Sequence, residues 1–151
     1  MLKKLIFLVF LLASCEDEYY YIDSDFESIV ENFYYEADLR GYHYSRNVSV
    51  VYDHEIKDAG EYHSKTRTVK INYDYIHPKI HLDSNHWQLA RLVVFHELGH
   101  YVGKVHRPFK YSIMNCGDWF DPNCGDFIGT VQYFNADKSH QKPIIDEFFS
   151  K

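Results

Sequence analysis

Three histidines, a glutamate and a glycine within residues 96–106 constrain this chain more than any other feature. The segment reads HELGHYVGKVH. On an α-helix, side chains four residues apart lie on one face, about 6 Å from each other, so His96 and His100 can reach one metal ion. Glu97 projects about 100° around the helix from His96, where it can contact a metal-activated water. The pattern predicts two helical metal ligands beside a free carboxylate.

The third histidine, His106, can join this site only if the helix ends before it. A continuing helix would carry His106 about 15 Å further along the axis. Gly103 is suited to reverse the chain, because glycine adopts left-handed backbone angles without a Cβ clash. We therefore expect His96, His100 and His106 to hold one catalytic Zn²⁺ and to leave a coordination position open. The alternative is a helix with two surface histidines and a third in a loop.

This segment resembles the zinc motif of the metzincin clan of endopeptidases. The resemblance continues into Ser112-Ile113-Met114-Asn115, because in metzincins a methionine in a tight turn follows the third histidine and lies under the metal. It implies that Met114 fills this role and that Glu97 is the general base of peptide-bond hydrolysis. Some metzincins have a tyrosine two residues after the methionine, where this chain has Cys116. Residues 26–151 are also loosely similar to small bacterial lipoproteins regarded as zinc metalloproteinases.

Hydrophobic spacing and end signals predict three helices. The first begins at a capping box formed by Ser24 and Glu27 and ends at Gly41. The last opens at Pro143, because proline is favoured in the first helical turn. The three helices are expected near residues 25–40, near residues 85–101 (the zinc-binding helix) and from residue 143 onward.

Two strands are predicted, at 48–52 from a β-branched run and at 66–73 from alternating residues, with a polar turn around 58–60. In metzincins the strand that lines the cleft is a sheet edge that pairs with extended substrate. Strand 66–73 is a candidate for this role, and an interior position agrees equally well with its sequence. The resemblance implies an α+β, minimal zincin/metzincin-like fold, with a small mixed sheet, an early helix, a zinc-binding helix, a methionine turn and a C-terminal helix.

Residues 1–14 have the pattern of a bacterial lipoprotein signal peptide. Two lysines precede an apolar run, Leu5 to Leu12, that is too short to span a bilayer comfortably. Leu12-Ala13-Ser14-Cys15 resembles a lipobox, which is cut before the cysteine so that Cys15 receives lipid. The resemblance implies a protein anchored in the bacterial cell envelope, at the outer membrane or cell surface. An ordinary secretory signal with a coincidental cysteine is the alternative.

The length and composition of the chain fit one domain. Its 151 residues are 46% hydrophobic and 18% aromatic, enough for one compact core and too few for two. We expect an acidic linker at 15–23 and the catalytic domain at 24–151. The net charge of −6 gives no reason to expect a nucleic-acid partner. The expected partners are a peptide or protein substrate and, through the lipid, the membrane, with the protein itself a monomer.

Cys116 and Cys124 are the cysteines that remain once Cys15 carries lipid. An oxidising compartment favours a disulfide between them, and two free thiols are the alternative. Cys116 as a fourth zinc ligand is less favoured, because closed four-ligand sites are structural. Aromatic residues after the methionine turn are candidates either for the wall of a specificity pocket or for the core: Trp119, Phe120 and Phe127.

Two other functions remain open. The third ligand could be a distant glutamate in place of His106, although the turn at Met114 speaks against this. The protein could also be a non-catalytic, zinc-containing binding lipoprotein, but Glu97 is needed for chemistry and not for holding metal. The seven remaining histidines show no ligand spacing. His77 and His81 are four apart, but Pro78 between them argues against a shared helical face.

Overall fold

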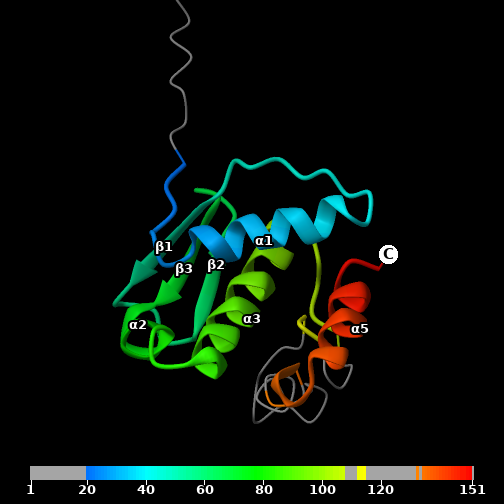
Figure 1. Ribbon diagram of the computed structural model, residues 1–151. Helices are drawn as coiled ribbons and strands as arrows, with labels where there is room; N and C mark the ends of the chain where they lie inside the picture. Colours follow the sequence, from blue (N-terminus) through cyan, green and yellow to red (C-terminus); the bar gives the residue numbers. More distant parts are fainter. Residues whose placement is uncertain (1–19, 108–111, 115–131, 133, 151) are drawn as a thin grey trace, which may run out of the picture.

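A computed structural model of the chain describes residues 20–107, 112–114, 132 and 134–150. Figure 1 shows the strands and the second helix at one end, the last helix at the other, and the first and third helices between them. The α+β prediction is confirmed. In chain order the elements are α1 (Glu27–Asp38), β1 (Ser49–Asp53), β2 (Gly60–His63), β3 (Thr68–Asn72), α2 (Tyr73–Ile80), α3 (Ser84–Tyr101) and α5 (Lys138–Phe148).

The sheet is small and mixed, with strand order β1-β3-β2. β1 runs parallel to β3, and β2 runs antiparallel to it. The strand expected at 66–73 is therefore the central one of the described strands. Of its two alternatives the interior position is confirmed and the position at a cleft edge is wrong, and the outer strands of this sheet are β1 and β2. β2 begins at the end of the turn predicted at 58–60, where the sequence predicted no strand. Alternation identified the buried face of β3 (Val69 and Ile71), but alternation carries no information about which strands pair.

Helix α1 agrees with the predicted helix, but its start is held differently. Its N-cap is Phe26, and no side chain caps the helix, so the capping box predicted at Ser24 and Glu27 is wrong. A backbone turn precedes the helix instead, in which the N–H of Phe26 donates to the Asp23 carbonyl at 2.8 Å. Gly41, with φ of 78°, follows the C-terminal end as the sequence predicted.

Prolines lie inside two helices, although Pro143 was predicted to open a helix and Pro78 was predicted to oppose a shared helical face. Pro143 was expected to open the last helix, but α5 begins at Lys138, where the Asp137 carboxylate accepts a hydrogen bond from the Ser139 N–H. Pro78 lies inside α2. A proline removes one backbone hydrogen bond, and a well-capped helix that packs on the core tolerates this loss.

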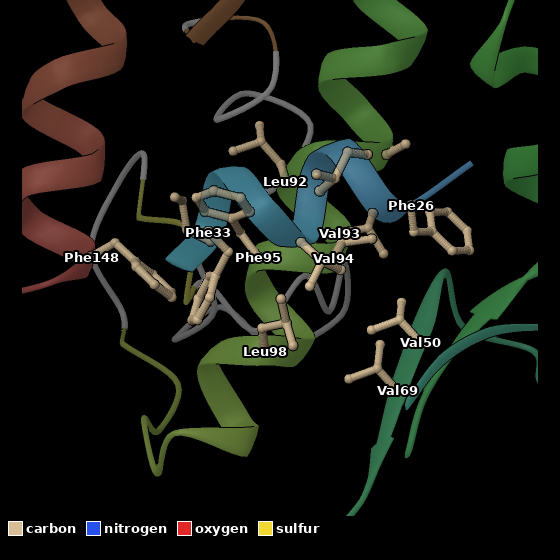
Figure 2. Packing of buried hydrophobic residues seen from close by; sticks show 14 of the residues in the cluster. Phe26, Phe33, Val50, Val69, Leu92, Val93, Val94, Phe95, Leu98 and Phe148 are labelled. Carbon is tan, nitrogen blue, oxygen red and sulfur yellow. The ribbon is translucent and has the colours of Figure 1, made fainter. Parts of the chain in front are cut away.

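The hydrophobic core surrounds α3. Figure 2 shows Phe33 of α1, Phe95 of α3 and Phe148 of α5 on one side, and Val50 and Val69 of the sheet on the other. The rings of Phe33 and Phe95 meet edge to face, with centroids 5.3 Å apart, a favourable aromatic geometry. All positions of α3 from Ala90 to Gly99 except His96 are buried. This burial makes α3 a rigid support for the side chains at its C-terminal end.

Part of the predicted linker belongs to the fold. The Val50 N–H donates to the Tyr21 carbonyl, and the Asp23 N–H donates to the Val50 carbonyl, both at 2.9 Å. The folded part thus begins at or before Tyr21, three residues earlier than the predicted boundary at 24. The predicted signal peptide and Cys15 lie outside the described residues. Within the described ranges, no helix is long and apolar enough to cross a bilayer.

Candidate metal centre

Helix α3 presents His96, Glu97 and His100 from its last turns, because capping groups hold both of its ends. At the start, the Asp83 carboxylate accepts hydrogen bonds from two backbone N–H groups of the first turn. These hydrogen bonds stabilise the charged carboxylate and lower the pKa of Asp83. At the end, Gly103 has φ of 83°. Its N–H donates to the His100 carbonyl, and the Lys104 N–H donates to the Gly99 carbonyl. This pair of bonds is a Schellman motif, which stops the helix and turns the chain back.

The turn brings the third histidine to the other two. The Nε2 atom of His106 lies 3.2 Å from Nε2 of His96 and 3.1 Å from Nε2 of His100. The possible ligand atoms of the three residues all lie within 4.8 Å of one another. The three histidines are therefore close enough to bind one metal ion. His96 is the most deeply buried of them and His106 the most exposed.

Backbone carbonyl groups orient two of the imidazoles. The Nδ1–H of His96 donates to the Ile113 carbonyl at 2.6 Å, and that of His100 donates to the Lys104 carbonyl at 3.1 Å. A carbonyl oxygen can only accept, so the neutral rings carry their proton on Nδ1 and direct the Nε2 lone pair at the shared point. Converging lone pairs repel each other, and a cation between them removes this repulsion.

Burial favours the neutral form of two of the three rings, those of His96 and His106. It lowers the pKa of His96 to about 4, and the neighbouring charges of His100 and His106 act in the same direction, while the Ile113 carbonyl opposes them. Burial also lowers the pKa of His106. Metal ions bind the deprotonated nitrogen, so both residues are in the ligand-competent form at neutral pH.

Glu97 faces the start of β2. Its side chain is buried, and a Cβ added to Gly60 would lie 2.8 Å from the Cγ of Glu97. Burial raises the pKa of Glu97 to about 7, the negative charge of Glu61 adds to this, and the Tyr62 backbone N–H opposes it. The contact between Gly60 and Glu97 was not predicted from the sequence, because β2 was not predicted.

Met114 is buried directly against α3. A Cβ at Gly99 would collide with the Sδ of Met114 and would come 3.0 Å from the Phe148 ring. Glycine at position 99 is therefore what allows the methionine turn (residues 112–114) to approach the helix. The sequence contained a signal for this contact, since a glycine inside an otherwise strong helix indicates close approach of another segment.

The residues expected to form a disulfide or a pocket wall lie outside the described residues: Cys116, Cys124, Trp119, Phe120 and Phe127. His77 and His81 make separate contacts. The ring of His77 stacks on Tyr73 with centroids 4.3 Å apart, and Nε2 of His81 lies 3.2 Å from the Asp25 carboxylate.

Comparisons with known proteins add no further assignment. No family model matches the chain, and neither a curated protein nor a solved structure is significantly similar to it. The resemblance to metzincins therefore depends on the motif residues alone.

Proposed function

We propose that the protein is a zinc-dependent endopeptidase with a minimal metzincin-like fold. The observation that supports it most is the convergence of three imidazole Nε2 atoms at the end of the helix that also carries the buried carboxylate of Glu97. Three neutral nitrogen ligands with a further position left open are typical of catalytic zinc sites, whereas structural sites use four protein ligands.

The donor set fits zinc in both chemistry and spacing. A tetrahedral Zn²⁺ about 2.0–2.1 Å from each nitrogen requires ligand atoms about 3.3 Å apart. The distances from His106 Nε2 to the other two Nε2 atoms, 3.2 and 3.1 Å, are close to this value. Imidazole also suits copper, nickel and iron, so the choice of zinc rests on the motif and on the hydrolytic chemistry proposed here.

Glu97 would act as the general base. Zinc held by the three histidines would supply a Lewis acid that acidifies water and polarises a carbonyl group. The Glu97 carboxylate would take the proton of the attacking water and pass it to the amine of the departing peptide. Contact with Gly60 limits the movement of Glu97. A base that is already held in place loses less conformational entropy when the transition state forms.

The edge strand β2 is the proposed contact for substrate. β2 pairs with β3 on one side, and its first residue, Gly60, lies against Glu97. An extended peptide that added to the side of β2 facing away from β3 would pass close to the proposed base. This geometry favours internal sites of extended chains, which is the substrate class of an endopeptidase.

Cleavage of a peptide library tests the proposal. The zinc-loaded protein should cut internal bonds, a chelator should abolish cutting, and added zinc should restore it. Glu97→Ala should retain zinc and the fold while losing at least about 10³-fold in activity. Equal cleavage by wild type and Glu97→Ala would end the peptidase proposal, and zinc-bound wild type without any cleavage would favour a non-catalytic binding protein. His106→Ala should lose zinc, whereas full retention would indicate a different third ligand.

We also propose that lipid on Cys15 anchors the protein to the bacterial envelope. The proposal depends on the lipobox-like residues 12–15 and the apolar run before them. Growth with an alkyne-labelled fatty acid should label the wild type and the matched Cys116→Ser variant, but not Cys15→Ala. Unlabelled wild type, released from membranes in soluble form, would contradict it.

A further inference from the structure

One carboxylate of the last helix joins the two chain segments that surround the metal centre. Glu147 of α5 accepts a hydrogen bond from Nη1 of Arg107 on its Oε1 atom and from the Oγ–H of Ser112 on its Oε2 atom, each at 3.0 Å. Arg107 directly follows the third histidine in the chain, and Ser112 begins the methionine turn. A single side chain from a distant helix therefore binds a residue next to His106 and a residue of this turn.

The first of these contacts leads to His106. Arg107 is the next residue in the chain, and its N–H donates to the Met114 carbonyl at 2.8 Å. The backbone after the third histidine is thus hydrogen-bonded to the methionine turn, and its side chain is ion-paired to α5. A shift of Arg107 would move the backbone that carries the His106 ring.

The second contact leads to His96. The buried Oγ of Ser112 donates to Glu147 and accepts from the Met114 N–H at 3.2 Å, which fixes the methionine turn. Ile113, in the same turn, supplies the carbonyl that holds Nδ1 of His96 at 2.6 Å. Loss of the acceptor at Glu147 would leave a buried hydroxyl without its partner and would free the turn to move.

These contacts are stronger than surface ion pairs. The side chains of Arg107 and Glu147 are 27% and 33% exposed, and Ser112 is 1% exposed. Hydrogen bonds to an ionised carboxylate in such partly buried places are stronger than neutral ones and are less screened by salt.

We propose that Glu147 is a positioning residue that sets the placement of His96 relative to His106 and thereby the affinity of the centre for its metal ion. The inference rests on the proposed metal site. Helix α5 supplies none of the candidate ligands, but through Glu147 it would control their geometry.

The neighbouring residue provides a matched control. Asp146 is also an acidic residue of α5, and its carboxylate pairs with Arg40 near the end of α1 and with Lys142. Asp146→Asn therefore removes an ion pair that docks α5 without touching the segment around the metal. If Glu147 merely attached α5 to the domain, the two variants would behave alike.

The experiment measures Zn²⁺ affinity by competition with a chromophoric chelator, together with the thermal midpoint of the metal-free protein. Glu147→Ala should weaken Zn²⁺ binding about 10- to 100-fold, the usual effect of losing a group that orients metal ligands. Asp146→Asn should bind Zn²⁺ as tightly as wild type, even if its thermal midpoint falls as much as that of Glu147→Ala. The visible spectrum of the Co²⁺ derivative should change in Glu147→Ala and not in Asp146→Asn.

Two further variants keep the inference falsifiable. Ser112→Ala should weaken Zn²⁺ binding in the same direction, and Glu147→Gln, which keeps the shape of the side chain, replaces Glu147→Ala if the latter does not fold. Zn²⁺ affinity within about threefold of wild type in folded Glu147 variants would overturn the inference and leave the proposed function intact. Failure of the wild type to bind Zn²⁺ would instead remove the proposed function and, with it, the inference.

Discussion

The Cγ of Glu97 lies so close to Gly60 that a Cβ on this glycine would come within 2.8 Å of it. Real Cβ atoms do not make contacts this short, so α3 and β2 approach each other at a point where only glycine fits. The same added Cβ would lie 3.0 Å from the Cγ1 of Val93, which is one turn before Glu97 on α3. The proposed base is thereby held between its own helix and the edge strand.

Gly60→Ala should therefore displace Glu97 and lower activity. We expect kcat/KM to fall about 10- to 100-fold, because small misplacements of a catalytic group cost that much. Zn²⁺ affinity should stay unchanged, since the atoms nearest to the added Cβ belong to Glu97 and Val93 and not to the three histidines. Peptidase assays and chelator competition measure the two quantities. Lys65→Ala, in the exposed turn after β2, is the control, and a fully active Gly60→Ala protein would show that Glu97 needs no such support.

Gly99→Ala should destabilise the fold, against the usual trend. In an open helix, replacing glycine by alanine adds about 0.5–1 kcal/mol of stability. Here the new methyl group would collide with Met114 and press on Phe148, and overpacking a core costs about 1–3 kcal/mol. Urea unfolding of the metal-free protein measures the sign. In the Gly99→Ala background, Met114→Ala should recover part of the loss; a stabilised single variant would refute the packing argument.

The pH dependence of stability should reveal two opposing buried groups. In the metal-free fold the pKa of His96 is about 4, below its ordinary 6.5, so stability is lost as pH falls through this window because the unfolded chain binds the proton more tightly. The pKa of Glu97 is about 7, above its ordinary 4.5, so stability is gained as pH falls from 7 to 4.5. Each effect is of order 3 kcal/mol.

Single variants separate the two effects. As the pH falls from about 7.5 to about 5, the two effects should nearly cancel in the wild type. The free energy of unfolding should then decrease by a few kcal/mol in Glu97→Gln and increase in His96→Gln. Urea unfolding with chelator present at both pH values provides the measurement. Parallel pH profiles for all three proteins would show that these groups do not have the shifted pKa values described above.

The two cysteines after the methionine turn are predicted to form a disulfide. Protein secreted into an oxidising compartment should resist thiol alkylation at Cys116 and Cys124 until a reductant is added. Mass spectrometry of the alkylated protein measures this directly, with Cys124→Ser as the control that exposes Cys116. Full alkylation without reductant would establish two free thiols instead.

The arrangement of the metal centre was predictable because its information is local. The spacing of His96 and His100 follows from helical geometry, and the turn at Gly103 follows from the preference of glycine for left-handed angles. The same reasoning failed at the sheet. Whether the strand at 66–73 is central or at an edge depends on β2, and β2 begins with Gly60 and Glu61, which the sequence does not distinguish from the turn before them.

The supporting contacts could not be predicted, because they join residues far apart in sequence. Nothing near Glu147 indicates that its carboxylate meets Ser112, and nothing near Glu97 indicates that Gly60 lies against it. Gly99 is the exception, since a glycine within a helix suggests a close neighbour even when the neighbour is unknown. The start of the last helix was also predicted wrongly, because Asp137 caps α5 and Pro143 lies inside it.

The reversal of the chain at Gly103 also bears on how the protein folds. Only five residues separate His100 from His106, so the loop between them closes at low entropic cost. The rings of His100 and His106 can thus meet before the sheet or α5 has docked, and if the proposed ion bound at this stage, it would act as a nucleus around which the later, long-range contacts form.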